Sequence, residues 1–504
     1  MLCSLPSATI VGVSAIPVEI QVDASAGIPG FHLVGLATGA VREAAVRIRT
    51  AVTHCGFKLG ATKLTVNLAP ADLRKDGAAF DLPIALATLS SRQLIALKRH
   101  DLLYCGELSL DGKLRAVPGA LCLAEHAHRR RLRGVVVPRA NAREAALVGI
   151  EVHAVDDLQQ AIAVAEGRQD TPYERETLPT ATSADDDVDF NEVQGQNDAR
   201  LAAEIAAAGG HNLLLIGPPG TGKTMIARRI AGILPSLSRS ETIEVTRIYS
   251  ICGKLGEGEL LVRRPFRSPH HTTSSVGLVG GGTPPRAGEV TLAHHGVLFL
   301  DELPEFPRRT LEALRQPLED EQVTIVRARH ALRFPARTML IAAMNPCPCG
   351  YRGCIKRSCR CSPAEVGRYC ARLSGPLLDR FDIFAAVQPP ETNALLDSAS
   401  EREDSATIAA RVADARKRQH RRLASFRVRT NAQLRGRKLH QAIKLTAPQQ
   451  ELLLDYAKQY PISVRALHRT CRVARTIADL DQRDQLRDED LLLALTLQQA
   501  RWQL

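Results

Sequence analysis

The sequence predicts an α/β protein of several domains, and three observations predict it. Residues 1 to about 165 alternate strand-like apolar runs with runs of helical periodicity, and a second alternation of this kind extends from residue 191 to about 390. A polar stretch separates the two, and after residue 390 the chain is helical in pattern and strongly basic. With 504 residues, the chain is long enough for several hydrophobic cores.

These changes in pattern predict four segments. Residues 1–166 form a compact α/β domain, and residues 167–190 form a linker, because this stretch holds two prolines and an acidic run without an apolar period. Residues 191–390 form a second α/β domain. Residues 391–504 form a basic helical domain, in which eleven Lys or Arg residues from Arg411 to Lys438 stand against one acid, Asp414.

The composition indicates a polyanionic partner. The formal net charge is +12, a balance typical of proteins that bind nucleic acid. The first residues resemble no signal peptide, and no run of about 18 apolar residues occurs. Twelve cysteines in such a chain favour reduced thiols or metal ligands over disulfides. We therefore expect a cytoplasmic protein with no membrane partner.

The most specific motif is a phosphate-binding loop. A short apolar run precedes a segment that fits G-x-x-x-x-G-K-[ST], and helical periodicity follows it. The segment consists of Gly217, Pro218, Pro219, Gly220, Thr221, Gly222, Lys223 and Thr224. Its glycines allow backbone N–H groups to turn toward phosphates, and the helix N-terminus adds its dipole. We expect Lys223 to reach the β and γ phosphates and the Thr224 hydroxyl to bind Mg²⁺.

A second apolar strand, "GVLFLDEL", ends in Asp301 and Glu302. An aspartate that helps place the metal and a glutamate that activates water are needed beside a phosphate loop. An acidic pair at this point could also be a solvated strand end, but the matching loop favours the functional interpretation. The two motifs together predict an enzyme that hydrolyses a nucleoside triphosphate, with ATP and Mg²⁺ bound.

The segments "GPPGTGKT", "LFLDE" and "IAAMNP" together resemble an AAA+ ATPase. "RPFRSPHH", "GEVTLAHHGVLFLDELPEF" and "RLSGPLLDRFD" are similar to the YifB/ComM group of its magnesium-chelatase-like branch, over nearly the whole chain. This resemblance implies a P-loop AAA+ α/β core and a helical C-terminal lid. It also implies that the turn 191–196 contacts adenine.

The same resemblance implies three further catalytic residues. Asn345 matches the sensor-1 position, whose side chain orients the attacking water, and Arg465 matches the sensor-2 arginine of the lid. Arg380 matches the arginine finger, which acts on the ATP of a neighbouring subunit. A finger supplied by a neighbour requires a ring of identical subunits, usually a hexamer. A surface ion pair is the alternative for each arginine.

Candidate DNA contacts lie outside the phosphate site. Arg327 and Arg329 stand between two strand-like runs, and their segment resembles the pore hairpin of MCM-like AAA+ proteins. Lys254 lies in a stretch that resembles the helix-2 insert of the same branch. Such residues would hold DNA phosphates without reading sequence. A solvated basic face is the alternative. His270 and His271 are interpreted as insert or interface residues.

Near the start, "LAPADLRKDGAAFDLPIA" resembles the catalytic domain of Lon protease. Ala79 stands where that family has its nucleophilic serine, and the downstream stretch 116–127 has no lysine to act as base. Peptidase chemistry is therefore excluded at this site. The sequence predicts a Lon-protease-like domain that serves as a scaffold or binds a partner.

Five cysteines crowd the segment after Asn345. Cys347, Cys349, Cys359 and Cys361 form two C-x-C pairs that could hold one structural Zn²⁺, with Cys354 as a spare ligand. Reduced surface thiols and a redox switch are the alternatives.

The sequence as a whole predicts a ring-forming ATPase that moves along DNA. The resemblance implies helicase or branch-migration activity in homologous recombination during natural transformation. The alternative is the ATPase motor of a magnesium-chelatase-type metal-insertion or protein-remodelling complex. A third hypothesis, a non-enzymatic or proteolytic adaptor, conflicts with the intact phosphate loop and with Ala79.

Overall fold

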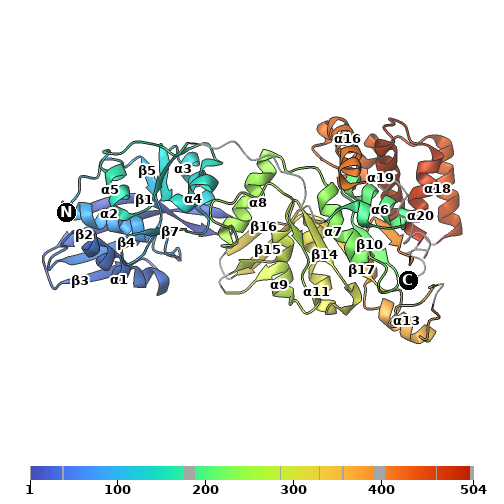
Figure 1. Ribbon diagram of the computed structural model, residues 1–504, viewed down its shortest axis with the longest axis horizontal. Helices are drawn as coiled ribbons and strands as arrows, with labels where there is room; N and C mark the ends of the chain where they lie inside the picture. The colour runs from blue at the N-terminus through green and yellow to red at the C-terminus, as the bar shows by residue number, and fades with distance from the viewer. Residues whose placement is uncertain are drawn as a thin grey trace. The chain divides into compact units, whose positions relative to one another are not determined.

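The computed structural model describes residues 2–36, 39–75, 77–174, 188–283, 285–327, 330–354, 357–389, 403–460 and 463–499. Most of the predicted linker (175–187) and the predicted boundary at residue 390 lie outside these ranges. The chain divides into two compact units (Figure 1). The first comprises residues 1–180, 238–262 and 326–334, and the second comprises the rest. Within the described ranges, every helix is too short or too polar to cross a membrane.

The first unit is built on two main sheets and a short pair of strands, β6 (Glu107–Leu108) and β7 (Leu114–Arg115). In the larger sheet, β1 (Leu2–Val11) and β2 (Ser14–Ser25) form a long antiparallel hairpin, and the order is β1-β2-β4-β3, with β3 (Gly30–Val34) and β4 (Lys63–Ala69). The smaller sheet is parallel and consists of β5 (Leu102–Tyr104), β8 (Gly134–Pro138) and β9 (Glu151–Val155). Every second residue of β4 is buried, as expected for a strand with one face on a core.

Helices cover these sheets. They are α1 (Gly39–His54), α2 (Asp81–Ser91), α3 (Ala120–Arg129), α4 (Arg139–Ala146) and α5 (Leu158–Ala165). The helix α2 is apolar on nearly all sides and buried, and its one carboxylate, Asp81, lies 2.7 Å from the Arg47 guanidinium. The helix α8 (Arg239–Ile251) also packs in this unit, because the Ser250 hydroxyl accepts a hydrogen bond from the Gly119 backbone at 2.9 Å.

The second unit is built on a five-stranded parallel sheet in the order β11-β14-β17-β10-β18. The strands are β10 (Leu213–Ile216), β11 (Phe266–Arg267), β14 (Val297–Leu300), β17 (Met339–Met344) and β18 (Ile383–Ala386). The three central strands are apolar throughout and fully buried. Such continuous apolar runs are typical of parallel strands that are covered on both faces. The prediction of a mixed α/β fold is therefore confirmed.

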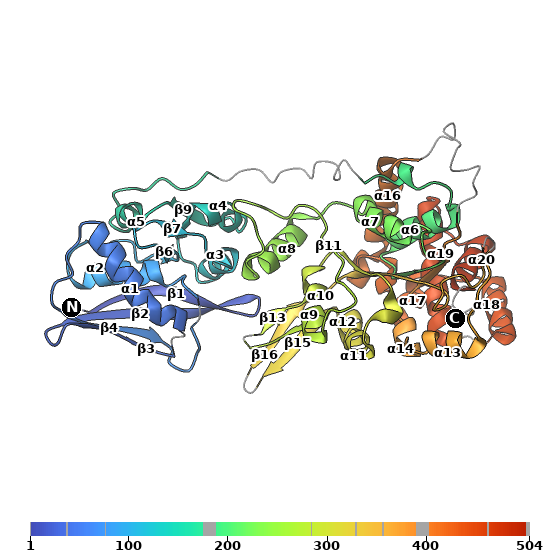
Figure 2. The same ribbon diagram turned by 60° about the horizontal axis from the view of Figure 1, so that its bottom comes forward.

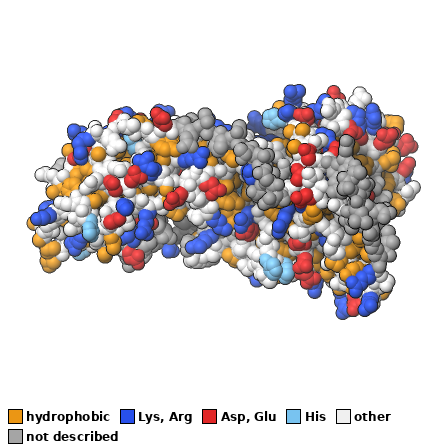
Figure 3. Space-filling model, viewed as in Figure 1, with side chains coloured by type: hydrophobic (Ala, Val, Ile, Leu, Met, Phe, Trp, Pro, Cys, Tyr) orange, Lys and Arg blue, Asp and Glu red, His pale blue; other side chains and the backbone are white. Residues whose placement is uncertain are grey.

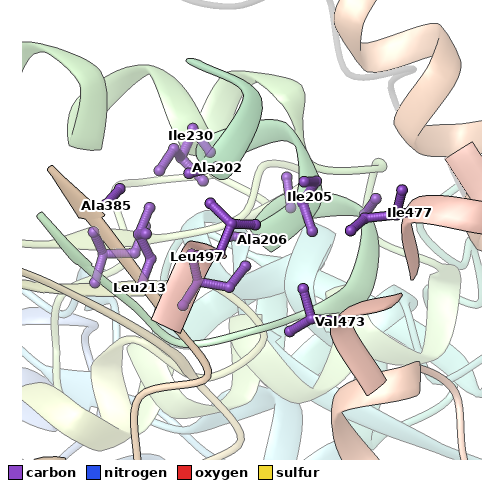
Figure 4. Close-up of a cluster of buried hydrophobic side chains, with 14 of the residues drawn as sticks. Ala202, Ile205, Ala206, Leu213, Ile230, Ala385, Val473, Ile477 and Leu497 are labelled. Carbon is purple, nitrogen blue, oxygen red and sulfur yellow. The ribbon is translucent and has the colours of Figure 1, made fainter. Parts of the chain in front are cut away.

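The helical C-terminal region packs against this sheet. Its helices are α16 (Ser405–Leu423), α17 (Gly436–Ala442), α18 (Ala447–Gln459), α19 (Val464–Leu480) and α20 (Asp488–Gln499). They share one core with α6 (Asn197–Gly209) and α7 (Lys223–Ile233). Figure 4 shows part of this core: Ala202, Ile205, Ala206, Leu213, Ile230, Ala385, Val473, Ile477 and Leu497.

Shorter elements complete the second unit and its margins. They are α9 (Ser275–Val279), α10 (Glu289–Leu292), α11 (Arg308–Ala313), α12 (Arg315–Asp320), α13 (Pro363–Cys370) and α14 (Gly375–Leu378). The predicted hairpin is present as β15 (Gln322–Arg327) and β16 (His330–Pro335), which pair with each other (Figure 2).

A buried carboxylate joins the helix α19 to the sheet. Asp382, directly before β18, accepts a hydrogen bond from Arg472 of α19 at 2.6 Å and lies 3.2 Å from the ring of His211. Burial alone would raise the pKa of Asp382, but Arg472 and His211 hold it well below its usual range. The ionised form is therefore the one that the fold stabilises.

Replacing Asp382 with Ala should lower the free energy of unfolding by about 3–5 kcal/mol at pH 7, because Arg472 would remain buried without its carboxylate. Urea unfolding measures this loss. The folded-state pKa is depressed, so the contribution is present above the unfolded pKa and should shrink as the pH falls below about 4. Asp414→Ala is the matched control, since that exposed carboxylate pairs with Lys417 at the surface; an equal loss there would contradict the prediction.

Candidate active site

Three neighbouring strands of the second unit end at the same edge of the sheet, and each is followed by polar residues. β10 leads into the phosphate loop (217–224), β14 into Asp301 and Glu302, and β17 into Asn345. These residues meet because the strands are parallel and adjacent. They enclose a cavity of about 470 Å³, which is lined by Pro219, Gly220, Thr221, Gly222, Lys223, Thr224, Met225, Asp301, Glu302, Met344 and Asn345.

The phosphate loop depends on its glycines. Gly220 and Gly222 have φ angles of 76° and 82°, which residues with a Cβ rarely adopt. At Gly217 a Cβ would lie 2.1 Å from the Val387 carbonyl oxygen, so only glycine fits there. Gln196 donates a hydrogen bond to the Thr221 carbonyl, which places the end of the turn 191–196 against the loop.

Lys223 is the first residue of α7 and lies almost wholly inside the site. Its ammonium donates to the carbonyls of Gly217 and Pro218 at 2.8 and 2.7 Å, and to Asn345 Oδ1 at 3.2 Å. Burial lowers the pKa of Lys223 to about 8, against the opposing effect of Asp301 and Glu302. The predicted phosphate-binding lysine is therefore in direct contact with the predicted sensor-1 residue.

Two side chains whose oxygen atoms could bind Mg²⁺, Thr224 and Asp301, lie side by side. The Thr224 hydroxyl donates to Asp301 Oδ2 at 2.6 Å, and both residues line the cavity. Hydroxyl and carboxylate oxygens are the ligands that Mg²⁺ takes beside substrate phosphates. The pair therefore fits the ion that the sequence predicts.

Glu302 has a partner that sequence reasoning missed. Its Oε2 atom lies 3.3 Å from Nδ1 of His271, which follows β11. The backbone of Glu302 is left-handed, with φ 50° and ψ 48°. The "SPHH" stretch is visible in the sequence, but the contact depends on the pairing of β11 with β14, which no local pattern reveals.

The two other predicted catalytic residues lie away from this cavity. Arg380 follows α14 and forms an ion pair with Glu319 of α12. Arg465 is exposed in the first turn of α19. Neither is among the described residues that line the cavity. Arg469, one turn further along α19, is buried and donates to the Asp379 carbonyl at 2.6 Å, so this helix holds the turn that carries Arg380.

The four cysteines of the two C-x-C pairs form one cluster. Sγ of Cys347 lies 3.4 Å from that of Cys349 and 3.6 Å from that of Cys359, and all four sulfurs lie within 4.8 Å of one another. Cys354 is described but does not belong to this group. Blue side chains (Lys or Arg), with red acidic ones among them, lie at the lower right of Figure 3, where Figure 1 draws α13.

The cysteine segment also contacts the phosphate loop. Gly350 has a φ of 85°, and a Cβ there would lie 2.7 Å from Cδ of Pro219 and 3.8 Å from Cγ of Asn345. The turn that begins at Cys347 therefore packs closely against two parts of the cavity wall. A change in the backbone at Gly350 would therefore displace Pro219 of the phosphate loop.

The predicted DNA contacts are placed only in part. The hairpin strands are described, but Arg329 and the side chain of Arg327 lie outside the described parts of the chain. Lys254 is exposed, just after α8 in the first unit. Two arginines of the segment that follows Lys254 form hydrogen bonds within the protein. Arg264 donates to the His295 carbonyl at 2.7 Å, and Arg267 donates to the Glu289 carboxylate at 2.6 Å.

In the first unit, the residues around Ala79, where the related proteases have their nucleophile, are held by hydrogen bonds within the fold. The Ala79 carbonyl accepts a hydrogen bond from the Gly106 backbone at 3.0 Å. Lys75 is buried and donates to the Pro70 carbonyl, and burial lowers the pKa of its ammonium. Ala79 offers only a methyl group, so no nucleophile stands at this position.

Comparison with known proteins bears on the phosphate site. The family model for magnesium chelatase, subunit ChlI, matches residues 189–395; models for subunit ChlI of Mg-chelatase and for its C-terminal part match residues 20–141 and 402–498. The uncharacterized protein YifB of Salmonella typhimurium is 45% identical over 96% of this chain and 94% of its own length. Competence protein ComM of Haemophilus influenzae is 42% identical over 96% and 95%.

The chain belongs to the YifB/ComM family of magnesium-chelatase-like proteins. Residues over 38% of its length are also 24% identical to DNA replication licensing factor Mcm6 of Drosophila melanogaster. Membership in this YifB/ComM family, together with the phosphate-loop site, supports an ATPase that uses ATP and Mg²⁺. The predicted resemblance to the family is thus confirmed.

Gly350→Ala should raise the KM for ATP and lower kcat/KM by about tenfold, because the new methyl would push Pro219 and the phosphate loop out of place. Steady-state ATP hydrolysis measures both constants. The matched control is Gly353→Ala, which has a similar positive φ of 72° but open space around its Cβ. If both variants lost activity equally, backbone strain rather than the contact with Pro219 would be responsible.

Proposed function

We propose that this protein is a ring-forming AAA+ ATPase that couples ATP hydrolysis to movement along DNA. The observation that carries the proposal is the shared cavity at the carboxyl ends of β10, β14 and β17, where the phosphate loop, an Asp–Glu pair and a polar sensor meet. These groups can position a triphosphate and a water molecule for phosphoryl transfer.

The roles follow from the contacts. Lys223 exchanges its bonds to loop carbonyls for phosphate oxygens, and Thr224 with Asp301 would hold Mg²⁺, which neutralises phosphate charge when bound. Glu302 accepts a proton from the attacking water, and Asn345 orients that water. Because Asn345 also bonds Lys223 at 3.2 Å, the two positions are set relative to each other.

The ring part of the proposal rests on Arg380 and Arg465. In a homo-oligomer, the hexamer usual for such motors, Arg380 exchanges Glu319 for the γ phosphate of a neighbour, and Arg465 contacts nucleotide from the lid. The proposed layout keeps residues 191–390 as the AAA+ core and 391–504 as the lid. Residues 1–166 serve as a Lon-protease-like scaffold without its serine, joined by the linker 167–190.

The proposal that the protein moves along DNA rests on its positive charge and on its relatives. The net charge is +12, and the exposed Lys254 and the hairpin arginines, Arg327 and Arg329, would hold phosphates. Two relatives are named for competence and for DNA replication licensing. We extend the proposal to helicase or branch-migration activity in recombination during natural transformation, in the cytoplasm.

A second candidate is the motor of a magnesium-chelatase-type complex, because all three family models that match the chain are named for that enzyme. Such a motor would hydrolyse ATP with the same residues but would act on a protein partner. DNA would then change neither its ATP turnover nor its products.

We also propose that Cys347, Cys349, Cys359 and Cys361 hold one structural Zn²⁺. In a tetrahedral site with Zn–S bonds of about 2.3 Å, neighbouring sulfurs lie about 3.8 Å apart. The observed separations of 3.4–3.6 Å are close to this value. Two backbone N–H groups, of Cys349 and Cys361, point at cluster sulfurs at 3.4 Å, as is typical around bound thiolates.

The motor function is tested with a labelled three-way DNA junction. The parent protein with ATP should separate the strands, and Lys223→Ala should abolish this because the phosphates lose their cation. Glu302→Gln should still bind ATP but lose at least a hundredfold in turnover. ATP turnover in the parent without strand separation or stimulation by DNA would favour the chelatase-type motor instead.

The zinc site is tested by metal analysis of the purified protein. We expect about one Zn²⁺ per chain, lost in Cys359→Ser, because three thiolates and a hydroxyl bind the ion far more weakly. Cys354→Ser is the matched control and should keep its zinc, since this thiol lies outside the cluster. Equal zinc loss in both variants, or a parent protein without metal, would rule the site out.

A further inference from the structure

The segment that carries the cysteine cluster also carries an unbalanced positive charge. Residues 346–361 contain four Lys or Arg residues, and no Asp or Glu occurs anywhere in residues 322–364. Three of the four cations are exposed, namely Arg352, Arg357 and Arg360, and we call them the turn arginines. Their guanidinium groups therefore form a patch of one sign on the surface of the second unit.

Other arginines that follow this segment have carboxylate partners, whereas the turn arginines have none in the described part of the chain. Arg372 pairs with Glu305 at 2.9 Å, and Arg380 pairs with Glu319. No such ion pair is formed by the three turn arginines with any described residue. An arginine without a carboxylate partner keeps its forked donors for an anion from outside the chain.

The cysteine cluster fixes the backbone that carries two of these arginines. The backbone N–H groups of Tyr351 and Arg360 donate to the sulfur of Cys349. The Tyr351 carbonyl accepts a hydrogen bond from the Cys354 backbone at 3.0 Å, which closes a tight turn with Arg352 inside it. Because these positions are set before any ligand arrives, little backbone entropy is lost when a ligand binds.

The third turn arginine, Arg357, is held by an aromatic ring. Its guanidinium lies 4.3 Å from the centroid of the Tyr351 ring and donates to the Tyr351 hydroxyl at 2.9 Å. This hydrogen bond uses one of five N–H donors, so others can reach phosphate oxygens. A guanidinium also offers a flat face on which an unpaired base can stack. An acidic protein segment has no use for such a face, so the combination favours DNA as the partner.

We propose that the turn arginines hold the phosphodiester backbone of DNA, so that the cysteine segment is a DNA contact in addition to the predicted hairpin. Guanidinium groups match phosphate oxygens in geometry, and such contacts position DNA without reading its sequence. The same segment packs against the ATP site, since a Cβ at Gly350 would lie 2.7 Å from Pro219. DNA bound here therefore contacts the element that supports the phosphate loop. The inference rests on the proposed function, in which the protein acts on DNA.

The experiment measures the binding of the full chain to a labelled DNA single strand, and to the same sequence as a duplex, over a series of salt concentrations. The test variant replaces the three turn arginines together: Arg352→Ala, Arg357→Ala and Arg360→Ala. Losing three phosphate contacts should weaken binding about a hundredfold at about 0.1 M salt. The slope of log K against log salt concentration should fall by about 2 for the single strand or about 3 for the duplex. A fall with only one form of DNA identifies the form that this segment binds.

The matched control removes the same charge from three exposed arginines of the first unit: Arg115→Ala, Arg129→Ala and Arg130→Ala. Its salt slope should stay near that of the parent. Replacing the three turn arginines with Lys should also keep the slope, because an ammonium still neutralises a phosphate. This second variant separates the loss of phosphate contacts from damage to the fold of the cysteine segment.

Equal falls of the slope in the two Ala variants would overturn the inference, because general attraction to a basic protein would then explain both. A Lys variant with the slope of the turn-arginine Ala variant would also overturn it. If the parent and the turn-arginine Ala variant bind DNA with the same affinity and slope, only this inference is wrong. If the parent binds neither form of DNA, the proposed action on DNA is wrong as well.

Discussion

The parallel pairing of β14, β17 and β10 is the constraint on which the candidate site depends. Each strand is a short apolar run buried on both faces, and each ends where its sequence turns polar. Adjacent parallel strands necessarily present their carboxyl ends together. An aspartate, a glutamate, an asparagine and a phosphate loop from distant parts of the chain therefore share one cavity of about 470 Å³.

Sequence reasoning reached what is local in the chain and missed what depends on strand order. The phosphate loop and Asp301 could be predicted because each directly follows an apolar strand, and Asn345 because its segment resembles that of AAA+ ATPases. The contact of His271 with Glu302 could not, because it depends on β11 lying next to β14. The packing of residues 238–262 with the first unit was also invisible, since nothing in α8 itself states which core its apolar face meets. The partner of Arg380, Glu319, lies 61 residues away and likewise follows from tertiary packing.

The helix α19 links several parts of the second unit through buried charges. Arg469 holds the turn before Arg380, Arg472 holds Asp382, and Asp479 accepts from Arg422 of α16. Buried arginines are costly to desolvate, so each is found with a carboxylate or carbonyl partner. The exposed Arg465 is on the same helix. A small rotation of α19 would therefore shift the turn of Arg380 as well, because the buried pairs transmit the movement as a rigid connection.

Because β11 is short, it should open locally more often than the central strands of the sheet. Only Phe266 and Arg267 pair with β14, so this outer strand is fastened by far fewer backbone hydrogen bonds than the six-residue β17 at the centre. Local opening at such an edge costs only a fraction of the global unfolding free energy. The amides beyond Arg267 should then exchange with solvent well before those of the central strands. If their opening is slower than phosphoryl transfer, the flexing of one short strand, rather than chemistry, sets the pace of the catalytic cycle.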